Sequence, residues 1–328
     1  MLKSAIKYII SIGVAAALLW FLFAKIDIMS MVAQFAQLNY GVIALSILLS
    51  ALSHYVRAWR WSLLLHSLGH KVSNISAYHG VVIGYLANLV LPRMGEVTRC
   101  GILYKSNKVP VEQSLGTVLS ERLIDVLMLG VVSMLCLVIE FDKVSSFFGQ
   151  YFSGSGVFSN GWVIIILSVL LIMMVSAGIY YWQNKEKINA RYPIISKIYL
   201  VLIGFVNGAM SALRVKNIAE FMLSTLLLWI LYYLVVYVTF YSYSTNTDTT
   251  PGMVLVTLMV GTLGFSAPVQ GGLGAYHLFV SAVLVMYGYG NQDALFMATV
   301  QNTTQLVTFI ATGTVSLIIM AWYNKNIK

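Results

Sequence analysis

The sequence predicts an all-α, polytopic integral membrane protein. Of its 328 residues, 59% are hydrophobic and only 9% are charged, and the mean hydropathy is +0.83. A soluble domain carries about 25% charged residues, so this composition excludes a soluble globular protein. Apolar runs of the length that crosses a bilayer recur from end to end. We therefore expect a single membrane domain over residues 1–328.

Six apolar runs are long enough to be full transmembrane helices. They cover residues 4–24, 40–65, 115–139, 161–182, 218–244 and 294–322. The first run is too long for a signal-peptide core and lacks a clear cleavage site, so we interpret it as a retained span. Residues 27–38 and 194–213 predict helices that lie along the membrane surface.

Two further apolar segments are interrupted by proline and glycine. Segment 75–91 ends in a stretch with Pro92 and Gly95, and segment 251–289 is broken at 266–274. Both flanks of segment 75–91 are basic, so we predict a re-entrant hairpin. Backbone of this kind is tolerated at membrane depth where protein or water covers it.

Loop charges predict the orientation. Region 183–217 is strongly basic, which places this amphipathic link in the cytoplasm by the positive-inside rule. Both termini then fall in the cytoplasm, and segment 251–289, flanked by Asp248 and Asp293, enters from the opposite face. The net charge of +9 is explained by these loops, so we expect no nucleic-acid partner.

The chain divides into two weakly similar halves, 40–139 and 218–322. Each half has a long span, an interrupted segment and a closing span. Interrupted segments in corresponding positions are the best sequence pointer to a transporter's binding site, and entry from opposite faces predicts an inverted repeat.

Charged residues follow the first interruption. Pro92 suits the first turn of a new helix, and Arg93, Glu96 and Arg99, spaced by three, share one face of it. An open helix N-terminus beside two arginines is a good anion site. Alternatively, Glu96 simply neutralises the two arginines at the level of the lipid headgroups.

A second charged group lies about one turn or more inside a predicted span. Glu121, Arg122 and Asp125 are each costly within a membrane, so they need partners, and Arg93 or Arg99 is the obvious candidate. Ionisable residues at such depth predict a functional site, although a purely structural network is the alternative. Arg57 and Arg60 are interpreted as snorkelling to cytoplasmic headgroups, with recruitment of an anionic lipid as the other interpretation.

The second interruption contains no charges. Its hinge residues are a proline and three glycines: Pro268, Gly271, Gly272 and Gly274. Unwound backbone at this point can bind a headgroup or an ion. Polar side chains around the two interruptions are secondary candidates for the site: Asn88 at the first, and Gln270, His277 and Gln301 at or after the second.

Three motifs in this order resemble the lysylphosphatidylglycerol synthase transmembrane, or flippase-like, family. They are Pro92-Arg93-x-Gly95-Glu96-x-x-Arg99, then Thr117-Val118-x-x-Glu121-Arg122-x-x-Asp125, then Pro268-x-x-Gly271-Gly272-Leu273-Gly274. The resemblance implies a bacterial or archaeal inner-membrane protein that moves lipids or lipid-linked sugars between leaflets. It covers the family's membrane module without the soluble aminoacyl-transfer domain of the best-known members. Gln270 and His277 stand where the family often has proline and glutamate, so a carboxylate role cannot be transferred there.

The leading functional hypothesis is a lipid translocase of the cytoplasmic membrane. Its substrate would be an anionic or amino-bearing phospholipid, or a polyprenyl-phosphate-linked headgroup, bound by six residues: Arg93, Glu96, Arg99, Glu121, Arg122 and Asp125. The alternatives are a membrane-embedded transferase and a non-catalytic accessory subunit, and the sequence leans away from an enzyme because it shows no catalytic motif. We predict no cofactor and no metal site. A homo-oligomer and a partner enzyme both remain open.

Overall fold

The computed structural model describes residues 28–91, 93–141, 143, 210–244, 248–267 and 269–326. The predicted spans 4–24 and 161–182 and most of the link 183–217 lie outside the described residues, as do the predicted hinge residues Pro92 and Pro268. Within the described ranges the regular secondary structure is entirely helical, which confirms the predicted class.

Four described helices are long and apolar enough to cross a membrane. They are α3 (Tyr40–Ser67), α6 (Val111–Ile139), α10 (Ile218–Phe240) and α13 (Asn291–Asn326). Each matches a span predicted from the sequence to within a few residues. The 28 residues of α3 extend about 42 Å at 1.5 Å per residue, so α3 is long enough to span the hydrocarbon core of a bilayer.

Polar side chains define several helix starts. The Asn39 side chain accepts from the backbone N–H groups of Gly41 and Val42 at the start of α3. Asn217 accepts from the N–H of Glu220 at the start of α10, and Thr250 accepts from the N–H of Met253 at the start of α11 (Pro251–Ser266). Such caps satisfy N–H groups that have no partner within the helix.

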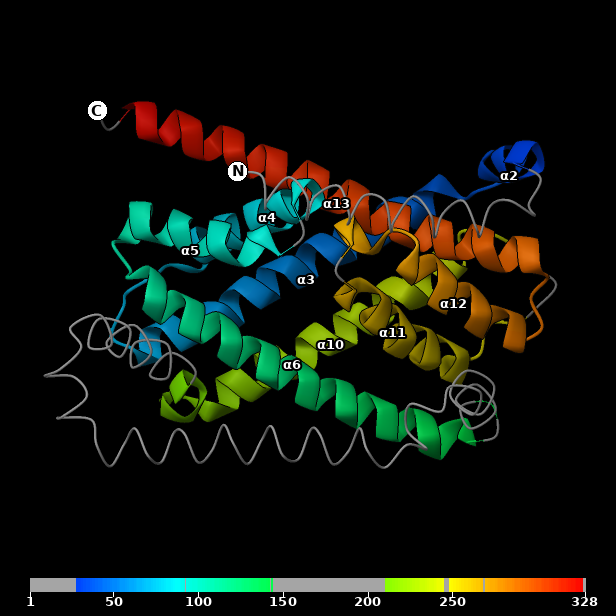
Figure 1. Ribbon diagram of the computed structural model, residues 1–328, viewed down its shortest axis with the longest axis horizontal. Coiled ribbons are helices and arrows are strands. Elements are labelled where there is room, and N and C mark those ends of the chain that lie inside the picture. Colours follow the sequence, from blue (N-terminus) through cyan, green and yellow to red (C-terminus); the bar gives the residue numbers. More distant parts are fainter. Residues whose placement is uncertain are drawn as a thin grey trace, which may run out of the picture.

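Each interrupted segment forms a helical hairpin. The first consists of α4 (Asn74–Val90) and α5 (Met94–Asn107). The second consists of α11 (Pro251–Ser266) and α12 (Ala275–Met286), joined through the 3-10 turn η2 (Gln270–Gly272). The two hairpins enter the bundle from opposite ends, and their tips meet near its middle (Figure 1).

The two helices of each hairpin approach each other closely at glycine residues. A Cβ added at Gly84 of α4 would lie 2.9 Å from the carbonyl oxygen of Gly95 in α5. In the second hairpin, a Cβ at Gly264 would lie 2.7 Å from the Cα of Tyr276. Small residues let helix backbones approach this closely, as is common between helices in membranes.

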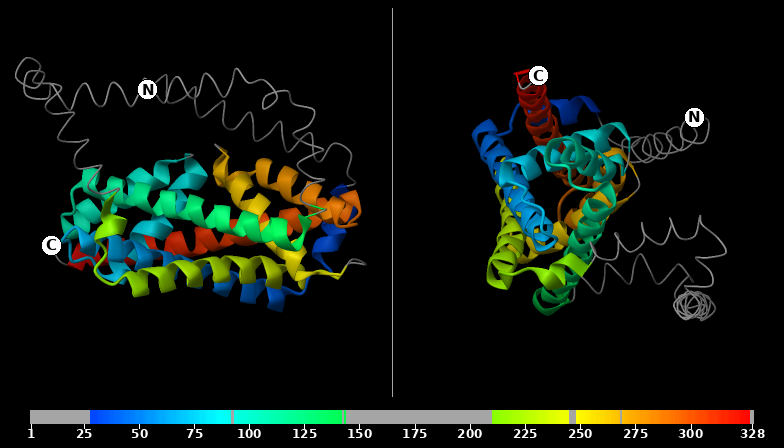
Figure 2. Two further views of the ribbon diagram at one scale, coloured as in Figure 1. Left: turned by 90° about the horizontal axis from the view of Figure 1, so that it is seen from below. Right: turned by 90° about the vertical axis from the view of Figure 1, so that its left-hand side faces the viewer.

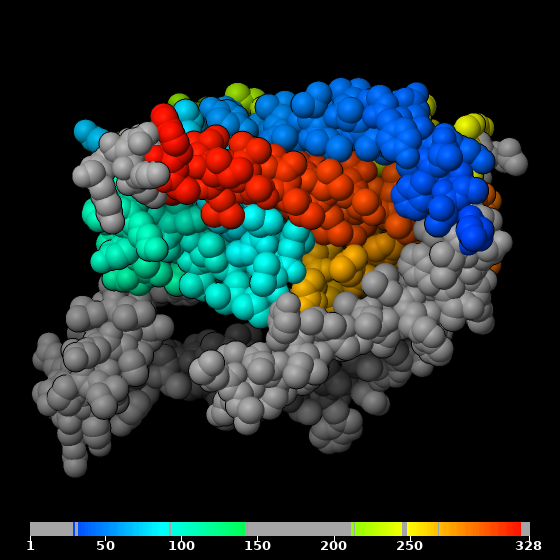
Figure 3. Space-filling model, turned by 90° about the horizontal axis from the view of Figure 1, so that it is seen from above, coloured from blue at the N-terminus to red at the C-terminus, as the bar shows by residue number. Residues whose placement is uncertain are grey.

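The tip of the second hairpin packs against helices from both halves of the chain. A Cβ at Gly271 would contact the side chains of Leu89 in α4 and Leu306 in α13. Viewed from above, α4 and α12 lie end to end along the flank of α13 (Figure 3). The hairpin tips therefore approach one another beside α13.

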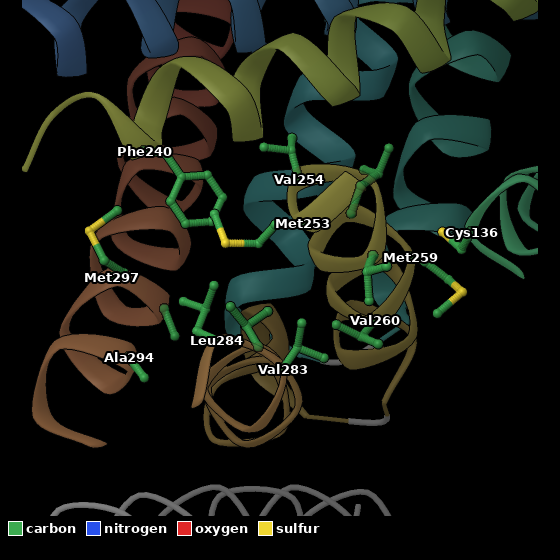
Figure 4. Packing of buried hydrophobic residues seen from close by; sticks show 14 of the residues in the cluster. Cys136, Phe240, Met253, Val254, Met259, Val260, Val283, Leu284, Ala294 and Met297 are labelled. Atoms are coloured by element: carbon green, nitrogen blue, oxygen red, sulfur yellow. The ribbon is translucent and has the colours of Figure 1, made fainter. Parts of the chain in front are cut away.

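Two apolar clusters surround the hairpins. One cluster packs α11 and α12 against α6, α10 and α13, with Phe240, Met253, Leu284 and Met297 among its members (Figure 4). The other packs α4 and α5 against α3 and α6 around Trp61 and Leu103. Each cluster also contains residues from the other half of the chain, such as Cys136 of α6 in the first and Phe221 of α10 in the second. The division into two halves and their inverted-repeat relationship stay predictions.

The two ends of the bundle differ in charge. The start of α4 and the end of α5 lie at one end of the bundle (Figure 2). By the helix bounds, Lys71, Lys105 and Lys108 belong to this end, whereas Asp248 and Asp293, next to the starts of α11 and α13, belong to the opposite end. The short helix α2 (Ile28–Phe35) lies at the acidic end, where Gln34 donates to Asp293 at 2.7 Å. A cytoplasmic location for the basic end follows from the positive-inside rule and stays a prediction.

Candidate functional site

A buried ion-pair network joins α3, α5 and α6. Arg57 of α3 contacts Glu121 at 2.5 Å and Asp125 at 3.0 Å, and Arg60 contacts Asp125 at 2.7 Å. Arg99 of α5 contacts the other oxygen of Glu121 at 2.9 Å. The Glu121 side chain is fully buried, and that of Asp125 is 17% exposed. The helical spacing of Glu121 and Asp125 places both carboxylates on the face of α6 that meets α3.

The interpretation of Arg57 and Arg60 as snorkelling residues is wrong. Their side chains are 7% and 0% exposed, and both point at the carboxylates of α6. The face of α3 that carries both arginines packs inside the bundle, so they contact the carboxylates of α6 and not lipid headgroups. Arg57 also donates to the hydroxyl of Tyr232 on α10 at 3.0 Å.

An aromatic ring positions Arg99. Its guanidinium carbon lies 4.6 Å from the centre of the Trp61 ring, a cation–π contact. The indole N–H of Trp61 in turn donates to the hydroxyl of Thr117 at 2.9 Å. Thr117 lies one turn before Glu121 on α6, so these contacts fix Arg99 opposite its carboxylate.

A second ion pair lies at the surface beside the network. Arg122 contacts Glu96 at 3.0 Å, and the two side chains are 47% and 25% exposed. This pair links α5 to α6, and it shows where the predicted site residue Arg122 lies: at the surface, paired with Glu96. Surface pairs of this kind contribute little to stability.

Arg93 stands apart from both groups. It is exposed and forms the N-cap of α5 in the left-handed conformation, with φ of 64°. Of the two arginines predicted as partners for the carboxylates, Arg99 is the one that contacts Glu121. Asn88 reaches across the tip and accepts from the backbone N–H of Gly95 at 2.6 Å, which satisfies one open N–H at the start of α5.

The buried network carries a surplus of positive charge. Its arginines are Arg57, Arg60 and Arg99, against two carboxylates, Glu121 and Asp125. Three against two leaves one positive charge. Several buried guanidinium N–H groups have no hydrogen-bond partner among the described residues: Nε of Arg57, Nε and Nη1 of Arg60, and Nε and Nη2 of Arg99. Buried donors without partners are costly, and they suit an anion.

The tip of the second hairpin forms a separate, uncharged polar group. Gly271, Gly272 and Gly274 have φ values of 56°, 72° and 81°, a region that favours glycine. The Asn302 amide of α13 donates to the Gly271 carbonyl at 3.0 Å. The predicted candidates Gln270 and His277 are buried here, and Gln301 accepts from the Tyr276 hydroxyl at 2.8 Å.

An aromatic layer separates the two polar groups. The imidazole of His54 stacks on Phe309 with ring centres 5.4 Å apart and lies 4.9 Å from the ring of Tyr85. One turn before His54, the Ser50 hydroxyl donates to Gln305 at 3.0 Å. The sequence analysis assigned none of these residues to a site.

Comparison with known families agrees with this architecture. Residues 8–314 match the family described as the lysylphosphatidylglycerol synthase TM region. The chain belongs to that family. The match spans nearly the whole of the given sequence, so the protein is a multi-pass membrane protein with a lipid-related role. Searches of curated proteins and of solved structures give no match.

Proposed function

We propose that this protein moves phospholipids or lipid-linked molecules with a phosphate-bearing headgroup between the leaflets of the cytoplasmic membrane. The observation that carries the proposal is the surplus of guanidinium groups inside the bundle. Each of the three carboxylates is already paired with arginine. A phosphate has the charge and the acceptor oxygens that the remaining N–H donors need.

The pairing of the carboxylates with arginines also favours a phosphate over an amino group as the recognised part of the headgroup. An ammonium would need a carboxylate, and Glu121 and Asp125 already serve several arginines each. An incoming phosphate instead competes with these carboxylates for the same guanidinium groups. The carboxylates keep the site near neutrality when no lipid is bound, which lowers the cost of burying three arginines.

The hairpins supply the route. Helix α5 begins at the tip of the first hairpin near the middle of the bundle, where the positive end of its backbone dipole favours an anion. Arg93 at the exposed tip and the Arg122–Glu96 pair at the surface are the first contacts for a headgroup that arrives from the lipid. The acyl chains stay in the bilayer, and movement of the hairpins exposes the network to each leaflet in turn.

Leaflet exchange in proteoliposomes tests the proposal. Fluorescent phosphatidylglycerol, an anionic lipid, is compared with fluorescent phosphatidylcholine, with and without an imposed proton gradient. We expect wild-type protein to accelerate exchange of the anionic lipid, and Arg99→Gln to reduce it at least tenfold. Lys108→Gln is the matched control, because Lys108 is an exposed basic residue at the bundle end. Wild-type protein that exchanges no anionic lipid under either condition would overturn the proposal.

A further inference from the structure

The uncharged polar group at the second hairpin tip is separate from the arginine network. Gln301 and Asn302 of α13 are 6% and 1% exposed. They face Tyr276 of α12 and the unwound backbone at Gly271. Both amides are uncharged, so the group differs in chemistry from the arginine network on α3, α5 and α6.

Within the described part of the chain, each amide forms a hydrogen bond at one end, and its other end has no partner. Gln301 accepts from the Tyr276 hydroxyl, and its Nε2 has no hydrogen-bond partner among the described residues. Asn302 donates to the Gly271 carbonyl, and its Oδ1 has no partner in the same described part of the chain. Because the carbonyl of Gly271 accepts only, its bond assigns the Asn302 amide orientation. One buried donor and one buried acceptor therefore remain on adjacent residues.

This pair defines the class of ligand. A hydroxyl group both donates and accepts, so it satisfies the two free ends together. An anion would meet the Asn302 carbonyl oxygen, and a cation would meet the Gln301 amino group. We propose that Gln301 and Asn302 bind an uncharged, hydroxyl-bearing group, such as the glycerol or sugar of a lipid headgroup. This assignment rests on the proposed function, because it supplies a second position for the same headgroup.

The position of the amides fits a second stage of passage. Gln305, one turn after Asn302, bonds to Ser50 of α3, and Ser50 lies seven residues before Arg57. With a rise of 1.5 Å per residue, the amides and the arginines lie about 15 Å apart along the bundle. A single glycerol phosphate does not span that distance. The headgroup therefore visits the arginine network and the amides in succession, with its phosphate recognised at the first and its hydroxyl groups at the second.

Two lipids of equal charge isolate the contribution of the hydroxyl groups. Phosphatidylglycerol and phosphatidylmethanol are both monoanionic phosphodiesters, but only the first carries headgroup hydroxyls. Binding of each lipid to purified protein is measured by native mass spectrometry, for wild type, Gln301→Met and Asn302→Leu. Thr308→Val is the matched control, because Thr308 is buried on the same helix and its hydroxyl donates to the Thr304 carbonyl of that helix. Soluble glycerol phosphate is added as a competitor to distinguish a lipid headgroup from a free polyol phosphate.

We expect wild type to bind phosphatidylglycerol about fivefold tighter than phosphatidylmethanol, as one neutral hydrogen bond implies, and more if both ends bind. Each amide variant should lose this preference, while its phosphatidylmethanol affinity and the control stay unchanged. Failure of soluble glycerol phosphate to compete assigns the site to lipid, and effective competition assigns it to the free compound. Equal binding of both lipids by wild type, or equal loss of both in folded amide variants, would overturn the inference. Neither result depends on leaflet exchange, so this inference and the proposed function can be overturned independently of each other.

Discussion

Replacing Glu121 by glutamine is the sharpest perturbation of the ion-pair network. Glu121 is fully buried and contacts Arg57 at 2.5 Å, Arg99 at 2.9 Å and Arg60 at 3.6 Å. Glutamine has nearly the same shape, so the change removes charge without creating a cavity. Three buried arginines then share Asp125 as their only carboxylate in the network.

The expected cost follows from the burial. Removing one partner from a buried ion pair leaves an uncompensated charge and costs about 3–5 kcal/mol. The matched change Glu96→Gln breaks the surface pair with Arg122, whose side chain is 47% exposed. Exposed pairs contribute about 0–1 kcal/mol. We therefore expect a difference of about 3 kcal/mol between these two charge-removing variants.

Denaturant unfolding in detergent micelles measures both variants against wild type, followed by tryptophan fluorescence. The double variant Glu121→Gln with Arg99→Gln adds a coupling test. Because each change removes the other's partner, the double variant should be less destabilised than the sum of the two single variants. A Glu121→Gln protein as stable as Glu96→Gln, or strictly additive effects, would refute the description of a buried, coupled network.

Further predictions concern the hairpins and the residues around Arg99. Gly95→Leu should destabilise the protein by about 1–3 kcal/mol, because a side chain there meets the Gly84 carbonyl and Asn88; Gly101→Leu, at a glycine with open space around it, is its control in thermal unfolding. Arg93→Gly should relieve about 1 kcal/mol of backbone strain at φ of 64°. It should still slow the exchange of anionic lipid, since the guanidinium is lost. An unchanged exchange rate would show that Arg93 does not contact the headgroup during passage. Trp61→Phe should cost about 1 kcal/mol by deleting the bond to Thr117, measured by the same unfolding assay, and an unchanged stability would contradict the role of that bond. Cysteines placed at the exposed positions Ile75 and Ser106 should both react with an impermeant maleimide from the cytoplasmic side, while the buried Cys100 and Cys136 stay unreactive. Labelling of the two positions from opposite sides would disprove the prediction that the first hairpin is re-entrant.

Much of the fold was predictable because apolar length and helix breakers are local signals. The spans that became α3, α6, α10 and α13 needed only a count of apolar residues. The breaks at Gly95 and at Gly271–Gly274 marked both hairpin tips, since glycine and proline interrupt helices for steric reasons. Packing of the tips beside α13 depends on contacts between distant segments, and no local pattern encodes it.

The site was predicted only in part. Burial cost indicated that Glu121 and Asp125 need partners, and Arg99 proved to be one of them. The roles of Arg57 and Arg60 were missed, because neighbouring tryptophans resemble a membrane-interface belt. A better signal was available in α3, where buried polar residues recur at helical spacing: Ser46, Ser50, Ser53, Arg57 and Arg60. In an apolar span, such a polar stripe marks the face that meets other helices rather than lipid.

The central claim is that buried arginines receive a lipid phosphate during passage between leaflets. The most direct measurement is the exchange rate of phosphatidylglycerol in proteoliposomes for wild type, Arg99→Gln and Arg99→Lys, at equal reconstitution and with folding verified. If the claim is correct, the glutamine variant loses exchange at least tenfold, and lysine, which restores the charge without the planar donor fork, recovers part of it. Equal exchange by all three proteins would contradict the claim, because the guanidinium of Arg99 would then have no part in transport.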